Sequence, residues 1–397
     1  MPPSVTVVQI ITQLELGGAQ EIALSFCRDL DRDRYRMHLI TGPGGLLDDE
    51  ARSIPGLGFE HEPHLVRELR PATDVACVGS LAARLRRLRS ASPAPMIVHT
   101  HSSKAGILAR WAAVWAGAEI RIHHIHGFGF HPEQPWPVRR AFQAAEQLTA
   151  PITHAFVPVS EANRKVAESL GMLRGGRIAV VLPPGIDARE YEPEPGEGAA
   201  FRRELGIPPD APVVGMIACL KRQKSPRDFV LVAGRVAARR PETHFFIAGD
   251  GALRAEVEEE IAKQRLNGRF HLPGWRRDVR AAFAAADVLV LTSLWEGLPR
   301  VCFQAMAAKK PLVATRVDGI PEAVEDGGNG FLLEPHDLGG FADRILELLG
   351  NPDRARAMGA AGYRHLDRFD AGKMRKQLEQ LYERLLDTRG LSGPAPS

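Results

Sequence analysis

An acidic residue stands immediately before a Gly-Leu-Pro turn in the segment 295–308, which reads WEGLPRVCFQAMAA. The turn predicts the start of a helix, because Pro299 suits a first helical position, where its missing N–H costs nothing. Gln304 lies eight residues after Glu296, which in a helix is about two turns, or roughly 12 Å along nearly one face. A nucleotide sugar spans that distance from hexose to ribose, and free N–H groups at the helix start would meet its phosphates. An ordinary capped helix at a sheet edge is the competing interpretation.

A cluster of cations, Lys221, Arg222 and Lys224, follows the strand predicted to start at Val213. Three positive charges at a sheet edge fit a diphosphate better than a neutral ligand, although a solvated surface would have the same composition. Glycines follow two further strands, in FIAGDGALR and FHLPGWRRDV. Because glycine has no Cβ, a flat base such as uracil could lie against the main chain there. These glycines are Gly249, Gly251 and Gly274.

Histidines end two predicted strands of the first half, in VHTHSSKAG and IRIHHIHG. Strand alternation places His124 and His126 on one face and His123 on the other. A metal site needs convergent ligands and usually a carboxylate or thiol, and none is near in sequence, so we do not predict zinc here. Instead His126 is expected to hydrogen-bond a ligand hydroxyl, while His123 and His124 pack. His99 and His101 are expected to divide in the same way, one facing the sheet and the other the ligand.

Two weaker signals lie near the N-terminus. Gly17 and Gly18 in LGGAQEIA would let a ligand approach the backbone at a helix start, but a plain tight turn is as good an explanation and the pattern is not GxGxxG. Asp29, Asp31 and Asp33 have Asp-x-Asp spacing. They fall in a polar loop away from any strand end, so we interpret them as a solvated turn and predict no metal site.

Composition limits the class of protein. The 397 residues are 44% hydrophobic and 25% charged with a net charge of +3, which predicts a soluble two-domain protein without a membrane span and does not indicate a nucleic-acid binder. The N-terminus lacks the features of a secretory signal. The cysteines have no metal spacing and are expected to be reduced and mostly buried, so a cytoplasmic location is expected. They are Cys27, Cys77, Cys219 and Cys302.

One helix carries many arginines. In LAARLRRLRS (81–90), Leu81, Leu85 and Leu88 share a face, and arginines crowd the remainder. The pattern fits a solvated helix surface. It also fits a surface that docks on anionic lipid or on a phosphorylated acceptor.

Short β-branched runs alternate with helical patterns along the whole chain, which is typical of parallel sheets built from βαβ units. We expect two doubly wound domains, 1–190 and 191–370, with a ligand in the cleft between them. The Pro- and Gly-rich segment 190–212 is interpreted as a linker, and a last helix at 371–390 is expected to cross back to the first domain. Predicted helices include Ala19–Leu30, Ser80–Ala91, Lys104–Ala116, Pro137–Gln147 and Pro299–Ala308.

The motifs in chain order resemble retaining glycosyltransferases of the GT-B architecture, family 4 type. They are GGAQ, HTHSSKAG, HHIHGF, VPVSEANR, LPPGID, FIAGDG, LPGWRRDV, AADVLVLTSLWEGLP, AMAAKKPLVATRVDGIPEAV and GNGFLLEP. The resemblance implies two Rossmann-like domains facing a central cleft, the first binding an acceptor and the second the donor. It implies metal-independent transfer of a hexosyl unit, with retained configuration, from a nucleoside diphosphate sugar, expected to be UDP-linked.

The same resemblance assigns roles to residues. Catalysis falls to His126, beside the donor sugar, to Glu296, on the hexose hydroxyls, and to Lys224, on the diphosphate. The sequence departs from the family twice: Gln304 replaces a glutamate that binds the ribose, and Cys219 replaces an arginine whose charge Arg222 or Arg300 could supply. The implied donor-binding residues are Gly17, Gly18, Arg222, Gly249, Gly251, Trp275, Gly297, Leu298, Arg300 and Gln304, and the acceptor-side residues are His101 and Phe128.

Other functions remain open at this point. A nucleotide-sugar epimerase would keep the nucleotide site but need no acceptor, and a non-catalytic sugar-nucleotide binder would fit the two departures. The acceptor is expected to be a glycan, a lipid-linked sugar or a small molecule, and contact with an anionic membrane at its inner face is a further expectation. No cofactor beyond the nucleotide sugar is expected.

Overall fold

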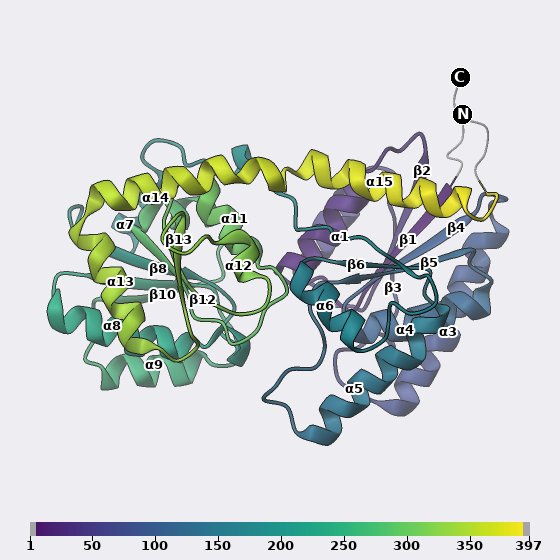
Figure 1. Ribbon diagram of the computed structural model, residues 1–397, viewed down its shortest axis with the longest axis horizontal. Coiled ribbons are helices and arrows are strands. Elements are labelled where there is room, and N and C mark those ends of the chain that lie inside the picture. The colour runs from purple at the N-terminus through teal and green to yellow at the C-terminus, as the bar shows by residue number, and fades with distance from the viewer. Residues whose placement is uncertain (1–4, 392–397) are drawn as a thin grey trace. The chain divides into compact units, whose positions relative to one another are not determined.

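The computed structural model describes residues 5–391, which form two compact units. The first unit comprises the chain up to Gly185 and again from Gly372, and the second unit is Ile186–Ala371. Each unit contains one parallel sheet with helices on both faces (Figure 1). The predicted pair of doubly wound α/β domains is therefore confirmed.

The first unit has a seven-stranded sheet in the order β3-β2-β1-β4-β5-β6-β7. Its middle strands β1, β4 and β5 are buried almost throughout, although they carry polar residues, as expected for strands covered on both faces. The strands are β1 (Val5–Ile11), β2 (Tyr35–Thr41), β3 (Gly58–His61), β4 (Met96–His101), β5 (Ile120–Ile125), β6 (Ala155–Pro158) and β7 (Ile178–Ala179). The helices are α1 (Gly18–Asp29), α2 (Asp48–Ser53), α3 (Pro71–Ser90), α4 (Ser103–Ala116), α5 (Trp136–Thr149), α6 (Glu161–Ser169) and α15 (Ala371–Asp387).

The C-terminal helix α15 packs into the core of this first unit. Leu378 and Tyr382 are fully buried in the cluster that α1 forms with β1 and β2. Tyr35 of β2 meets the Tyr382 ring edge-on at 5.7 Å between centroids, and the Tyr35 hydroxyl donates to Glu383 at 2.6 Å. Residues more than 340 positions apart are thus held together by burial and by hydrogen bonds.

The second unit has a six-stranded sheet in the order β10-β9-β8-β11-β12-β13. This order places β8 and β11 side by side, although β9 and β10 lie between them in sequence. The strands are β8 (Val213–Ile217), β9 (His244–Ala248), β10 (Phe270–Gly274), β11 (Val288–Leu291), β12 (Leu312–Thr315) and β13 (Gly330–Leu333). The helices are α7 (Glu197–Glu204), α8 (Pro226–Arg239), α9 (Arg254–Lys263), α10 (Val279–Ala285), α11 (Arg300–Ala307), α12 (Ile320–Ala323), α13 (Leu338–Gly350) and α14 (Pro352–His365).

The expected linker at 190–212 is wrong in part. It contains α7, whose Phe201 is 2% exposed and meets the Phe246 ring at 5.3 Å. Eight residues between Gly- and Pro-rich flanks are too few for a clear helical period, so this tertiary contact was hidden from the sequence. Helix α3 likewise begins at Pro71, nine residues before the predicted start, because its first turns are mostly small or polar.

The arginine-rich helix α3 buries Leu81 and Leu85, as predicted. Its arginines, however, are paired within the chain. Arg84 donates to Glu60 at 2.6 Å and to Glu62 at 2.9 Å, and Arg87 donates to Glu60 at 2.7 Å. These ion pairs offset much of the positive charge that suggested a docking surface for anions.

The four cysteines are free, and three of them are buried, as expected for reduced thiols. Burial raises the pKa of Cys27 to about 12, which keeps this sulfur protonated and unreactive at neutral pH. Within residues 5–391, no helix combines the length and apolar character needed to cross a bilayer.

Candidate functional site

Glu296 lies in the loop between β11 and α11 and is 8% exposed. Its carboxylate accepts hydrogen bonds from three side chains. Lys224 Nζ and Ser293 Oγ donate to Oε1, the latter at 2.6 Å, and Gln223 Nε2 donates to Oε2 at 3.3 Å. A carboxylate held by several donors is fixed in position before any ligand binds.

Lys224 reaches Glu296 because of the strand order. It ends the short 3-10 turn Arg222–Lys224 that follows β8, and β8 neighbours β11 in the sheet. The main chains of the two loops are also joined, since Leu294 N donates to Gln223 O at 2.8 Å. The two predicted binding segments therefore meet at the carboxyl edge of the second sheet, where open α/β sheets bind ligands. Arg222, from the same cation cluster, is exposed.

Asp318 is a site residue that the sequence analysis missed. Its Oδ2 accepts from the Glu296 backbone N–H at 2.6 Å, and its own φ is +43°, in the left-handed region. Burial raises the pKa of this carboxyl. A second hydrogen bond, from Gly319 N–H to Gly297 O at 3.1 Å, joins the same two loops. The two bonds hold the Glu296 turn in place and offset the strained, buried conformation of Asp318. The sequence signal was the RVDGIP turn after β12, which faces the Glu296 loop only once the strands are ordered.

The predicted helix start needs correction. Helix α11 begins at Arg300, and Pro299 is its N-cap with ψ at 127° rather than its first helical residue. Glu296 therefore precedes the helix, and the two-turn spacing to Gln304 does not apply, because the loop adopts its own path. Gln304 is half-buried on α11. The Arg300 guanidinium donates to Tyr191 Oη at 3.4 Å, and burial lowers its pKa to about 10.

Gly249 and Gly251 have a structural reason to be glycine. A Cβ at Gly249 would lie 2.0 Å from Ala218 O, and one at Gly251 would lie 2.6 Å from Leu220 O. Their φ angles are +150° and +157°. The glycines let the chain leaving β9 lie against the chain leaving β8, which also shapes the edge where we expect the nucleotide. Trp275, predicted beside this edge, is 44% exposed.

Replacing Gly249 by alanine is expected to lower the free energy of unfolding by about 3 kcal/mol, because the new Cβ would overlap backbone atoms in a strained conformation. Gly268→Ala is the matched control, since its φ is +78° and no atom lies within 4 Å of the added Cβ; it should cost only about 1 kcal/mol. Urea unfolding of both variants measures the difference. Equal losses would show that close packing does not require Gly249.

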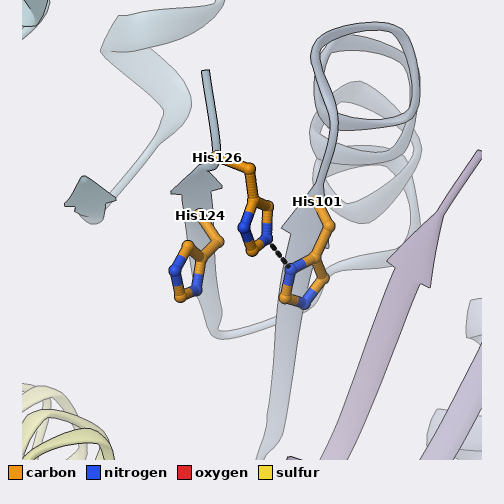
Figure 2. A group of neighbouring side chains, drawn as sticks. All are labelled: His101, His124 and His126. Carbon is orange, nitrogen blue, oxygen red and sulfur yellow. Dashed lines mark hydrogen bonds between the residues drawn. The ribbon is translucent and has the colours of Figure 1, made fainter. Parts of the chain in front are cut away.

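In the first unit, four histidine side chains stack at the carboxyl ends of β4 and β5. His126 follows β5, and its ring lies 4.2 Å from that of His124 at an interplanar angle of 3°. His101 ends β4, and its Nδ1 is 2.8 Å from His126 Nε2 (Figure 2). His99 stacks on His101 at 4.8 Å and both are fully buried, so the expected division of these two histidines between sheet and ligand is wrong. His123 faces the opposite side, where its Nδ1 is 3.0 Å from Thr100 Oγ1, so the predicted alternation is confirmed.

The ring nitrogens of His101, His124 and His126 lie within 4.8 Å of one another, as ligands of one metal could. Their planes argue against such a site. A metal lies in the plane of each imidazole that binds it, whereas the His124 and His126 planes are almost parallel. The 2.8 Å separation between His101 and His126 is also that of a hydrogen bond, and is shorter than the roughly 3.3 Å between two tetrahedral ligands at about 2.05 Å from zinc. The arrangement is a stack of hydrogen-bonded imidazoles.

The remaining predicted residues of the first unit lie at the start of α1 or in loops. Gly17 is the N-cap of α1 with extended backbone, and Gly18 is the first helical residue. Phe128 and Phe130 pair at 4.8 Å between ring centroids, and Phe128 packs on a small buried cluster. Asp31 accepts from the Asp33 backbone N–H at 2.9 Å, which makes the Asp-x-Asp segment a hydrogen-bonded surface turn.

Comparison with known protein families shows that the chain shares more than a fold with glycosyltransferases. Residues 199–365 match the model of the glycosyl transferases group 1, and residues 16–190 match that of glycosyltransferase family 4. The chain belongs to the group 1 glycosyltransferases of GT-B fold. Glu296 and Lys224 both lie inside the first matched segment, and His126 lies inside the second. The family recognised from the motifs, and its transferase activity, are therefore confirmed.

Individual relatives of this glycosyltransferase match most of its length. The UDP-Gal:alpha-D-GlcNAc-diphosphoundecaprenol alpha-1,3-galactosyltransferase of Escherichia coli is 28% identical over 340 residues, 84% of this chain and 85% of that protein. The alpha-maltose-1-phosphate synthase of Mycolicibacterium smegmatis is 28% identical over 337 residues, 78% of this chain and 84% of that protein.

Solved structures agree on the fold. Anabaena HepE in complex with UDP-glucose aligns with a TM-score of 0.79 at 20% identity, over 95% of this chain and 99% of that one. The sucrose-phosphate synthase of Thermosynechococcus elongatus aligns with a TM-score of 0.83 at 18% identity, over 96% of this chain and 100% of that one.

Proposed function

We propose that this glycosyltransferase moves a hexosyl unit from a UDP-sugar to a hydroxyl of a lipid-linked glycan precursor, retains the anomeric configuration and needs no metal ion. The observation that carries the proposal is the paired Lys224 and Glu296 at the carboxyl edge of the second sheet. UDP as the nucleotide is supported by the names of the galactosyltransferase relative and of the HepE complexes. The lipid-linked acceptor is supported by the diphosphoundecaprenol in the relative's name.

The proposed reaction is a single displacement at the anomeric carbon. The acceptor oxygen bonds to that carbon while the bond to the phosphate oxygen breaks, and the electron pair leaves with UDP. The acceptor proton passes to the departing phosphate oxygen on the same face of the sugar. Such a step asks the protein for positioning and for stabilisation of charge on the diphosphate, and no protein nucleophile is needed.

Each part of the edge has a proposed task. Lys224, with the backbone N–H groups at the start of α11, would take the negative charge of the diphosphate. Glu296 would accept hydrogen bonds from hexose hydroxyls. In the unliganded protein the two side chains bind each other, so the diphosphate would replace Glu296 as the partner of Lys224 and free a carboxylate oxygen for the sugar.

Metal independence is proposed because the site offers other positive partners to the diphosphate. The Lys224 ammonium and the main-chain N–H groups at the start of α11 can stabilise the charge that develops on the leaving group.

Thermal unfolding with a panel of nucleotide sugars tests the donor. A UDP-sugar at 100 times its dissociation constant should stabilise the protein by about 2.7 kcal/mol, whereas GDP- and ADP-sugars should have little effect. Transfer to a polyprenyl-diphosphate sugar, measured as UDP release, should be unchanged by EDTA. Loss of turnover in EDTA that returns with Mg²⁺ would overturn the metal-independent mechanism, and an altered free sugar without an acceptor would indicate an epimerase.

Contact with an anionic membrane remains a prediction, and three arginines of α3, Arg84, Arg87 and Arg89, are already paired with glutamates. Sedimentation with vesicles of anionic lipid, compared with neutral vesicles, tests it directly. Equal binding to both kinds of vesicle would exclude surface charge as the cause, and binding to neither would contradict the membrane contact.

A further inference from the structure

A continuous chain of hydrogen-bonded side chains runs from His126 into the core of the first unit. His126 Nε2 is 2.8 Å from His101 Nδ1, and His101 Nε2 is 2.7 Å from Gln9 Oε1. Gln9 Nε2 donates to Tyr382 Oη at 3.3 Å, and Tyr382 Oη is 2.6 Å from His99 Nδ1. Behind His126, every member of the chain is fully buried. The members come from β1, β4, the end of β5 and α15, so only the folded first unit brings them together.

The donors and acceptors of this chain determine its direction. The Gln9 amide nitrogen donates to Tyr382, so its carbonyl oxygen faces His101 and can only accept. His101 therefore carries its proton on Nε2, and its Nδ1 accepts from His126 Nε2–H. Each bond points away from His126. At the far end this order makes the Tyr382 hydroxyl the donor to His99 Nδ1, which places the His99 proton on Nε2, a buried nitrogen with no hydrogen-bond partner.

This assignment requires that each imidazole has one proton. Burial lowers the pKa of His99 and of His126 to about 3 and lowers the pKa of His101 well below its usual value. The rings are thus neutral at physiological pH. A neutral imidazole that donates through one nitrogen offers a lone pair at the other.

We propose that Gln9, His101 and Tyr382 are positioning residues that hold His126 in the tautomer protonated on Nε2, which leaves Nδ1 to accept a hydrogen bond from a donor-sugar hydroxyl. The contact with the sugar rests on the proposed function. The tautomer itself does not, because the hydrogen-bond chain is complete in the unliganded protein. Gln9 and Tyr382 act through His101 and need not touch the ligand.

The tautomer can be read directly by NMR of protein labelled with ¹⁵N in histidine, with His126→Asn used to assign the His126 signals. Tyr382→Phe keeps the buried ring but removes the hydroxyl that accepts from the Gln9 amide nitrogen. The Gln9 amide group can then rotate and exchange the positions of its oxygen and nitrogen. Tyr35→Phe is the matched control. It removes the hydroxyl of the adjacent buried tyrosine, which bonds to Glu383 and takes no part in the hydrogen bonds that lead to His126. Gln9→Leu breaks the next link independently, in case one variant is too unstable to study.

We expect the Nε2–H form of His126 in the wild type and in Tyr35→Phe, and a mixture of both tautomers in Tyr382→Phe and Gln9→Leu. A wild-type His126 protonated on Nδ1 would overturn the proposal. So would a His126 tautomer that stays the same in Tyr382→Phe or in Gln9→Leu.

Ligand binding gives a second readout that separates this inference from the proposed function. Affinity for UDP alone should be equal in the wild type, Tyr35→Phe and Tyr382→Phe, whereas affinity for the intact UDP-sugar should fall about 10-fold in Tyr382→Phe only, as when the partner that orients a functional imidazole is lost. Equal UDP-sugar affinity in the two variants would show that the chain does not position His126 for the sugar. A wild type that binds neither ligand would contradict the proposed function, and the NMR result would still decide the tautomer.

Discussion

Glu296→Ala is expected to lower kcat/KM for the donor by about 100-fold or more, because it removes a preorganised group at the reacting sugar. The carboxylate is held in position by Ser293 and Gln223 as well as by Lys224, and alanine has no group that could accept these bonds or bind a sugar hydroxyl. Initial rates of UDP release at varied donor concentration measure the loss.

One further variant separates the negative charge of Glu296 from its hydrogen bonding, and another is a control. Glu296→Gln keeps the size and an acceptor oxygen, so it should retain more activity than the alanine variant if hydrogen bonding to the sugar dominates. Glu334→Ala, which changes a glutamate with a 73% exposed side chain in the same unit, should leave the rate unchanged. Near-normal turnover in Glu296→Ala, with a folded protein confirmed by circular dichroism, would remove Glu296 from the site.

Much of the fold was predictable because its signals are local. Parallel strands covered on both faces are short apolar runs such as VVGMI in β8 and VLVL in β11, and these stand out between polar helical patterns. The alternation of His123 and His124 across a strand likewise follows from a period of two residues. Helix α7 was missed because its stability comes from a distant aromatic contact rather than from its own pattern.

The site was predictable only in part, because its geometry depends on strand order. Both Lys224 and Glu296 were identified from their local sequence, but their contact across 72 residues follows from β8 and β11 being neighbours. Asp318 could not be found without that order. The same holds for the link between His126 and Tyr382, which no spacing in the sequence indicates.

Lys224→Ala is expected to reduce turnover about as strongly as Glu296→Ala, and it should also destabilise the protein. Without the ammonium, the diphosphate loses a positively charged partner, which should lower kcat/KM by about 100-fold or more. It also leaves the Glu296 carboxylate, with a 6% exposed side chain, without its cation. Breaking a buried ion pair by removing one partner costs about 3 kcal/mol or more.

These two effects can be separated by a double variant. Adding Glu296→Gln to Lys224→Ala removes the uncompensated charge, so the free energy of unfolding should recover most of the loss while turnover stays low. Lys221→Ala is the control, since Lys221 is an exposed cation of the same cluster and should change kcat/KM by less than about 10-fold because charge in open solvent is screened. If the double variant recovered activity together with stability, Lys224 would serve only to neutralise Glu296. Low turnover and weaker UDP binding in a stable double variant would support direct contact between Lys224 and the diphosphate.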